Sequence, residues 1–190
     1  MRLTSIPPEA QSVAVWRNGG GMTREIFKAG DDADFLWRAS LARIDRSGPF
    51  SPFPGYQRTI ALVDGGPLDL VFEQERRQSL DPRLRAVSFP GAPPPRAELI
   101  DAPAAVFNLI ACERLSTRLL PRPLVGAMVL FDHPHEDWLI YLIGGEAELR
   151  LEGQRLWLGR EHAALLEGES HGARAVLDGG GEIVLVKIER

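Results

Sequence analysis

The sequence contains one cysteine and two lysines, and no apolar run long enough to cross a membrane. A lone Cys112 excludes a disulfide framework and a cysteine-based zinc site. The longest clear apolar run, Trp138–Ile143, is far shorter than the roughly 18–20 residues of a membrane helix. The first ten residues lack the apolar stretch of a secretory signal, and the net charge of −4 argues against a general nucleic-acid binder. These absences predict a soluble cytoplasmic protein without membrane or nucleic-acid partners.

Turn-forming residues, by contrast, are abundant. The 19 glycines and 15 prolines are scattered between short apolar runs and are not gathered into one linker. Apolar and polar residues alternate in many of these runs, for example in Phe35–Ile44 and Ala147–Glu152, as expected for half-buried strands. No segment has a long, capped period of 3.6 residues, so we expect an all-β fold with little helix.

The two halves of the chain resemble each other. Gly65–Gly91 and Gly144–Gly168 each contain a glycine pair, an alternating strand, a polar turn, a second strand and an apolar strand ending in glycine. This spacing is too long for a solenoid repeat and suits two copies of a small β-barrel. We therefore predict a bicupin, with tightly packed cupin-type barrels in residues 1–100 and 101–190 and with exchange of strands between them left open. A single β-sandwich is the alternative.

Arginine accounts for all but two of the 22 basic residues, a bias that a GC-rich genome explains for most of them. Three arginines, Arg24, Arg38 and Arg58, lie inside or beside strand patterns and away from any run of charge. An arginine that points into a barrel needs a partner, because burying an unpaired charge is costly. That partner is either an internal carboxylate, such as Glu25, or the carboxylate of a ligand, and we predict that at least one of the three contacts an anionic ligand.

Two loops have an unusual composition. Val15–Ile26 contains three consecutive glycines, but no Gly-Lys-Ser/Thr follows, so a phosphate-binding loop is not expected. Gly48–Arg58 interleaves aromatic residues with prolines and is suited to wall a pocket. Together with nearby strands, these loops supply hydrogen-bonding and apolar groups for a small-molecule site: Trp16, Asn18, Gly20, Thr23, Ser40, Phe50, Tyr56 and Asn108.

Four segments, WRNGGGMTREI, WRASLARI, GPFSPFPGYQRTIAL and FNLI, follow one another in the order and spacing typical of one family. On these motifs the chain resembles the HutD/Ves family. The resemblance implies a bicupin fold, a link to bacterial histidine utilisation, and a ligand-binding or regulatory role with an N-formylated amino acid as ligand. Among the matching positions are Trp16, Asn18, Gly20, Thr23, Arg24, Arg38, Ser40, Phe50, Arg58 and Asn108. The chain departs from the family pattern at Val106, where Asp is common, and at Cys112, where Arg is expected.

A metal site is a weaker hypothesis. Many cupins bind a metal through two nearby histidines, a glutamate and a later histidine, and His133, His135 and His171 are the candidates here. Glu136 follows His135 directly, which is too close for that pattern, and the N-terminal half has no histidine. We therefore expect no metal and no other cofactor.

Catalysis has little support in the sequence. No nucleophile signature is present, and acid–base chemistry in the N-terminal half would depend on Glu25, Asp45 or Tyr56. We assign no catalytic residue. The residues favour a non-catalytic bicupin that binds a small carboxylate metabolite. The family resemblance implies that this metabolite is one such as formylglutamate and that the protein regulates histidine utilisation. The alternatives are a metal-free or metal-dependent cupin enzyme acting on such a metabolite and a structural protein with a filled barrel; a homodimer is left open.

Overall fold

The computed structural model describes residues 1–31, 34–169 and 172–190. This part of the chain is almost entirely β-structure, and its helical segments are the single 3₁₀ turns Pro8–Ala10 and Glu73–Glu75. Within the described ranges, no helix is long and apolar enough to cross a membrane. The all-β prediction is confirmed, because the alternating segments form half-buried strands as their period requires.

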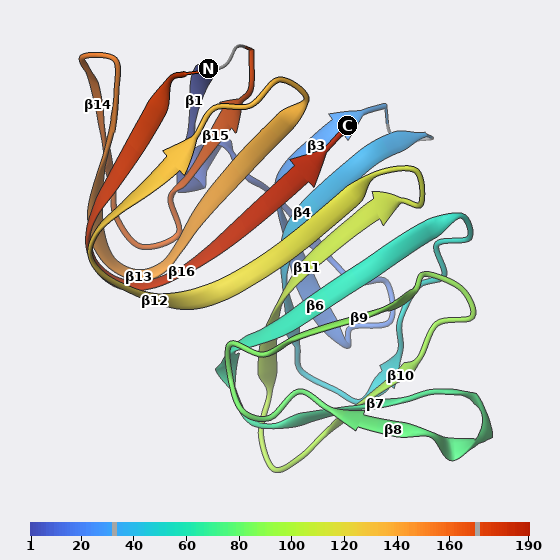
Figure 1. The fold of residues 1–190 in the computed structure, drawn as a ribbon. Helices are drawn as coiled ribbons and strands as arrows, with labels where there is room; N and C mark the ends of the chain where they lie inside the picture. Colours follow the sequence, from blue (N-terminus) through green and yellow to red (C-terminus); the bar gives the residue numbers. More distant parts are fainter. Residues whose placement is uncertain (32–33, 170–171) are drawn as a thin grey trace. The chain divides into compact units, whose positions relative to one another are not determined.

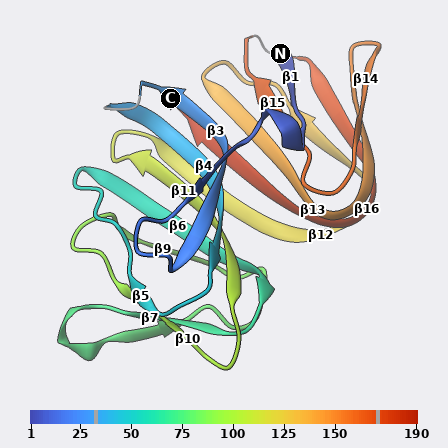
Figure 2. The ribbon, with the colours of Figure 1, turned by 180° about the vertical axis from the view of Figure 1, so that it is seen from behind.

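The described chain divides into two compact units, one made of residues 11–114 and the other of residues 1–10 and 115–190. These bounds differ from the predicted division at residue 100 for two reasons. Strand β11 (Ala104–Cys112) pairs with strands of the first unit, so that unit extends to residue 114. Strand β1 (Arg2–Ile6) pairs antiparallel with β15 (Ala163–Glu167), as Figure 2 shows, and so joins the sheet of the second unit.

The 11–114 unit contains two antiparallel sheets with its core between them. One sheet follows the order β2 (Ser12–Val15), β3 (Gly21–Gly30), β4 (Phe35–Ile44), β11, β6 (Tyr56–Gly65) and β9 (Ala86–Pro90). The other follows the order β5 (Gly48–Pro49), β10 (Arg96–Leu99), β7 (Leu68–Val71) and β8 (Arg77–Ser79). The described strands enclose a core without closing into a continuous hydrogen-bonded barrel. Leu62 and Val106 of one sheet and Leu68 and Leu70 of the other belong to this core.

The register of the three central strands gathers polar residues on the face that carries this core. Ile110 of β11 lies opposite Arg38 of β4 on one side and Arg58 of β6 on the other. Asn108 lies two residues before Ile110 on β11 and is paired with Ser40 of β4. Because side chains alternate between the two faces of a strand, these residues share one face of the sheet.

The second unit is built on three long neighbouring strands that bend strongly along their length (Figure 1). They are β13 (Glu136–Leu151), β16 (Arg174–Glu189) and β12 (Ser116–Phe131), with β15 and β1 continuing the sheet beyond β13 and with β14 (Gln154–Leu158) also paired to β13. Leucine, isoleucine and alanine side chains of these strands form a second core. Two such β units in one chain form the predicted bicupin type of fold and not the single sandwich.

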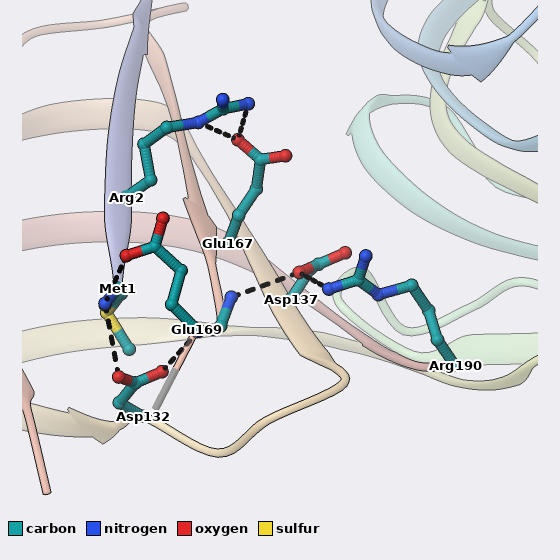
Figure 3. Close-up of polar contacts among 8 residues, drawn as sticks. Met1, Arg2, Asp132, Asp137, Glu167, Glu169 and Arg190 are labelled. Atoms are coloured by element: carbon teal, nitrogen blue, oxygen red, sulfur yellow. Dashed lines mark hydrogen bonds and ion pairs between the residues drawn. The ribbon is translucent and has the colours of Figure 1, made fainter. Parts of the chain in front are cut away.

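Ion pairs hold the edge strand β1 against the rest of this sheet (Figure 3). The ammonium group of Met1 contacts Asp132 Oδ2 and Glu169 Oε2, both at 3.2 Å. Arg2 forms an ion pair with Glu167, the residue opposite it in the β1–β15 register. The side chain of Asp132 is fully buried, and the Met1 ammonium group and the Glu169 amide, which donates to Asp132 Oδ1 at 3.3 Å, help to compensate its charge.

Asp137 is a second buried carboxylate in this unit and is 6% exposed. It accepts a hydrogen bond from Arg190 Nη2 at 3.1 Å and one from the Gly168 amide at 3.2 Å (Figure 3). Burial raises the pKa of Asp137, whereas the positive charge of Arg190 opposes this rise. Arg190, which directly follows β16, thereby links the end of this strand to the start of β13.

Candidate functional site

The 11–114 unit holds a cavity of about 120 Å³ on the polar face described above. Its walls come from the glycine-rich loop within Val15–Ile26, the aromatic loop within Gly48–Arg58, and strands β3, β4, β6 and β11. The lining residues are Trp16, Asn18, Thr23, Arg38, Ser40, Ala42, Pro49, Phe50, Ser51, Phe53, Arg58, Asn108 and Ile110. This volume is below the 300–1,000 Å³ typical of drug-sized ligands, so the cavity is suited to a small metabolite.

Arg58 is the most deeply placed charge in this cavity and is 6% exposed. Its Nε and Nη2 donate to Asn108 Oδ1 at 3.1 and 2.5 Å, and its guanidinium lies 4.0 Å from the ring centre of Phe50. No acidic side chain in the described part of the chain forms an ion pair with it. Burial, followed by the positive charge of Arg38, lowers the pKa of Arg58 to about 9. The group is therefore protonated at neutral pH and is a buried cation whose partner is a neutral amide.

Arg38 supplies a second cation to the same cavity. Its guanidinium lies 5.5 Å from the ring centre of Phe35 and 5.2 Å from that of Phe53, as in cation–π contacts. Its Nη1 is 4.0 Å from Glu25 Oε2, whereas its Nε is buried and has no hydrogen-bond partner among the described residues. Burial lowers the pKa of Arg38, and the charge of Glu25 opposes this. The hydrogen-bonding capacity of Arg38 is thus only partly used.

The glycine-rich loop places two further side chains at the cavity. Trp16 Nε1 donates to Thr23 Oγ1 at 2.8 Å, which fixes the indole against the start of β3. Asn18 Oδ1 accepts from the amide of Gly20 at 2.9 Å and closes the turn. A side chain at Gly21 would collide with the carbonyl oxygen of Arg43, so glycine is required there by the close approach of the two strands.

The aromatic loop contributes Phe50 and Phe53 to the wall of the cavity. Tyr56 does not line the cavity but contacts this wall: its ring centre lies 4.6 Å from that of Phe35 and 6.4 Å from that of Phe53, and its hydroxyl donates to the Phe35 carbonyl at 3.0 Å. Burial raises the pKa of this hydroxyl. Tyr56 therefore acts on the cavity through the rings that contact Arg38.

Three predicted site residues do not line the cavity: Gly20, Arg24 and Tyr56. Gly20 forms the turn through its backbone. Arg24 lies opposite Leu41 on β4, whereas its neighbour Thr23 lies opposite the lining residue Ala42, so the two side chains leave opposite faces of β3.

The sequence reasoning missed other lining residues: Ala42, Pro49, Ser51, Phe53 and Ile110. The period of two along β4 and β11 could have identified Ala42 and Ile110, since each lies two residues from a predicted site residue.

Of the positions that depart from the family pattern, Val106 is buried in the core, and Cys112 lies with Tyr56 in a separate hollow.

His133 and His135 do not belong to a metal-binding cluster within the described residues. His133 and His135 are both exposed, and His135 has a positive φ of 67°. No group of three or more histidine, cysteine or acidic side chains is arranged to hold a metal within the described ranges. His171 lies outside these ranges.

The lining of the cavity combines two guanidinium groups with hydroxyls, amides and aromatic rings. No acidic side chain is among the described lining residues; Glu25 lies just outside the lining, beside Arg38, and Asp45 forms an exposed ion pair with Arg43. Cations and neutral donors converging on apolar walls are suited to bind a small carboxylate, because the guanidinium geometry matches that of a carboxylate.

Comparisons with known proteins identify relatives of this chain. The chain is 40% identical over 99 residues to Protein Ves from Cronobacter sakazakii (52% of this chain, 54% of that protein). It is 39% identical over 107 residues to an uncharacterized 21.2 kDa protein in the hutC 3′ region of Pseudomonas putida (55% of this chain, 56% of that protein). The matched region spans about half the length of these relatives.

The structure of HutD from Pseudomonas fluorescens SBW25, determined in a formate condition, is similar over the whole of both chains, with a TM-score of 0.80 and 28% identity. The model of the HutD family matches residues 9–185, which include all the lining residues of the cavity. The chain therefore belongs to the HutD family.

Proposed function

We propose that this chain binds a small carboxylate metabolite in the cavity of the 11–114 unit and, as a non-catalytic regulator, adjusts histidine utilisation to the level of that metabolite. The observation that carries the proposal is Arg58, a buried cation whose hydrogen bonds end on the neutral amide of Asn108. A cation in such a place is costly unless an anion compensates it. A ligand carboxylate in the cavity supplies that anion.

The relatives support the metabolic context. One lies in the hutC 3′ region of its genome, and another is named HutD and was determined in a formate condition. Formate is the smallest carboxylate, and formylglutamate joins a formyl group to a molecule with two carboxylates. Formylglutamate is therefore the first ligand to test.

The experiment is a thermal-shift screen of the full chain with formylglutamate, formiminoglutamate, urocanate, glutamate and formate. A compound at 100 times its Kd is expected to stabilise the folded state by about 2.7 kcal/mol. Arg58→Met should fold and lose the shift. Arg43→Met, which removes an exposed arginine of the same unit, should keep it. No shift with any compound at millimolar concentration, or a full shift with Arg58→Met, overturns the proposal.

Two measurements test the regulatory part. Proton NMR of formylglutamate incubated with the protein should show binding without conversion, whereas conversion would favour the enzyme alternative. A strain deleted for this gene and complemented with Arg58→Met should grow on histidine like the deletion strain, and one complemented with Arg43→Met like wild type. Equal growth of both complemented strains contradicts a regulatory role for the cavity.

A further inference from the structure

The two arginines of the cavity differ in what compensates their charge. Arg58 donates to a neutral amide, whereas Arg38 lies 4.0 Å from the carboxylate of Glu25. Glu25 is on β3 opposite Ser40, which is two residues from Arg38 along β4. The protein thus places one acidic group beside one of two cations.

We propose that Glu25 is an internal counter-ion that competes with bound ligand for Arg38 and thereby sets how much negative charge the cavity accepts. This inference rests on the proposed function, since it concerns the same cavity. In the free protein, Arg58, Arg38 and Glu25 together carry one net positive charge. One carboxylate of a ligand compensates Arg58, and a second carboxylate must displace Glu25 from Arg38.

The contact between Glu25 and Arg38 has the properties of a replaceable pair. The two charged atoms are separated by 4.0 Å, which is at the outer limit of an ion pair, and both side chains are about one quarter exposed. In addition, the buried Nε of Arg38 has no hydrogen-bond partner among the described residues. A ligand carboxylate in the cavity can supply an acceptor that Glu25 does not.

Glu25 also has a second cation beside it. Lys28 Nζ lies 3.5 Å from Glu25 Oε1, closer than Arg38 is to Oε2. When a ligand takes Arg38, Glu25 keeps Lys28 as a partner and is not left as an isolated charge. The exchange therefore needs no large movement of β3.

The experiment compares two probes that differ by one carboxylate, butyrate and succinate, by isothermal titration calorimetry at pH 7.5 and constant ionic strength. The quantity measured is the selectivity ratio, the Kd for butyrate divided by the Kd for succinate. Glu25→Gln should raise this ratio about fivefold, in line with the weak strength of a partly exposed pair. Asp45→Asn, which removes an equal charge from an exposed pair of the same unit, should leave it unchanged.

Lys28→Met provides a second variant, since the loss of Lys28 leaves Glu25 more dependent on Arg38. Its selectivity ratio should fall below that of the wild type. The inference is overturned if both Glu25→Gln and Lys28→Met keep the wild-type ratio while Arg58→Met abolishes binding; the proposed function then stands alone. If the wild-type chain binds neither these probes nor the metabolites of the thermal-shift screen, the proposed function itself is wrong.

Discussion

Arg58 directs two of its donors, Nε and Nη2, to one acceptor, the amide oxygen of Asn108 on the neighbouring strand. The two residues are separated by 50 positions in the sequence and are joined by the pairing of β6 with β11. The amide satisfies hydrogen bonds without compensating the charge. This combination holds the guanidinium in place and leaves its charge to attract an anion.

Asn108→Asp should abolish anion binding. The new carboxylate would replace the amide with a shape that is nearly the same, and it would form an internal ion pair with Arg58. We expect the thermal shift with formylglutamate to disappear while the melting temperature of the free protein is maintained or rises. Asn108→Leu is the matched contrast: it leaves the buried donors of Arg58 without an acceptor and should cost about 1–3 kcal/mol in the free energy of unfolding. Persistence of binding in Asn108→Asp would contradict the role of Arg58.

Anion binding should weaken at alkaline pH. Because burial and Arg38 lower the pKa of Arg58 to about 9, its guanidinium is protonated below that pH and loses its charge above it. Titration calorimetry should therefore show a constant Kd for butyrate between pH 6.5 and 8. Above pH 9 this Kd should rise by up to about tenfold for each pH unit. A Kd that stays constant to pH 10.5 would show that Arg58 remains charged there. Arg58→Met should show no binding over the whole range.

Gly21→Ala should destabilise the protein. A methyl group at this position meets the carbonyl oxygen of Arg43 on the paired strand, and backbone atoms cannot move aside without disturbing the sheet. We expect a loss of about 1–3 kcal/mol in the free energy of unfolding, measured by urea denaturation. Gly48→Ala is the control, because nothing lies within 4 Å of the added carbon there. Equal stability of the two variants would rule out the close approach of β3 to β4.

Arg190→Ala should destabilise the second unit in a pH-dependent manner. Burial raises the pKa of Asp137, so the folded state loses stability relative to the unfolded chain as pH rises from the usual pKa of 3.8 through the folded-state value. Removing Arg190 takes away the charge that opposes this rise. The half-exposed arginine is expected to contribute about 1 kcal/mol, and the deficit should be larger at pH 7 than at pH 5 in denaturation experiments. In Asp137→Asn, removal of Arg190 should have a smaller effect, and a deficit independent of pH would contradict this account.

The sequence predicts the fold type because alternation and turns are local signals. The register that places Ile110 between Arg38 and Arg58 is not local, since it depends on β4, β6 and β11 meeting as neighbours. The sequence could therefore nominate Arg58 as a strand residue that needs a partner, but it could not identify Asn108 as that partner. It also grouped Arg24 with the other two arginines, although alternation after Thr23 places Arg24 on the opposite face of β3.

The division of the chain was harder to predict for a related reason. Arg2–Ile6 does not pair with the next strand in the sequence, β2, and its partner β15 lies far away along the chain. Nothing in the composition of this short strand indicates which sheet it joins. The predicted boundary at residue 100 likewise precedes β11, whose apolar pattern does not reveal that it completes the sheet of the first unit.

The pairing of β1 with β15 has a consequence for synthesis on the ribosome. Synthesis runs from the N-terminus to the C-terminus, so β1 is released before its partner, and strands β2 to β14 follow in between. The 11–114 unit can acquire all of its strands during this interval and can fold as translation proceeds. The strands of the 11–114 unit are thus all released after β1 and before β15, so that unit can assemble while β1 still waits for its partner.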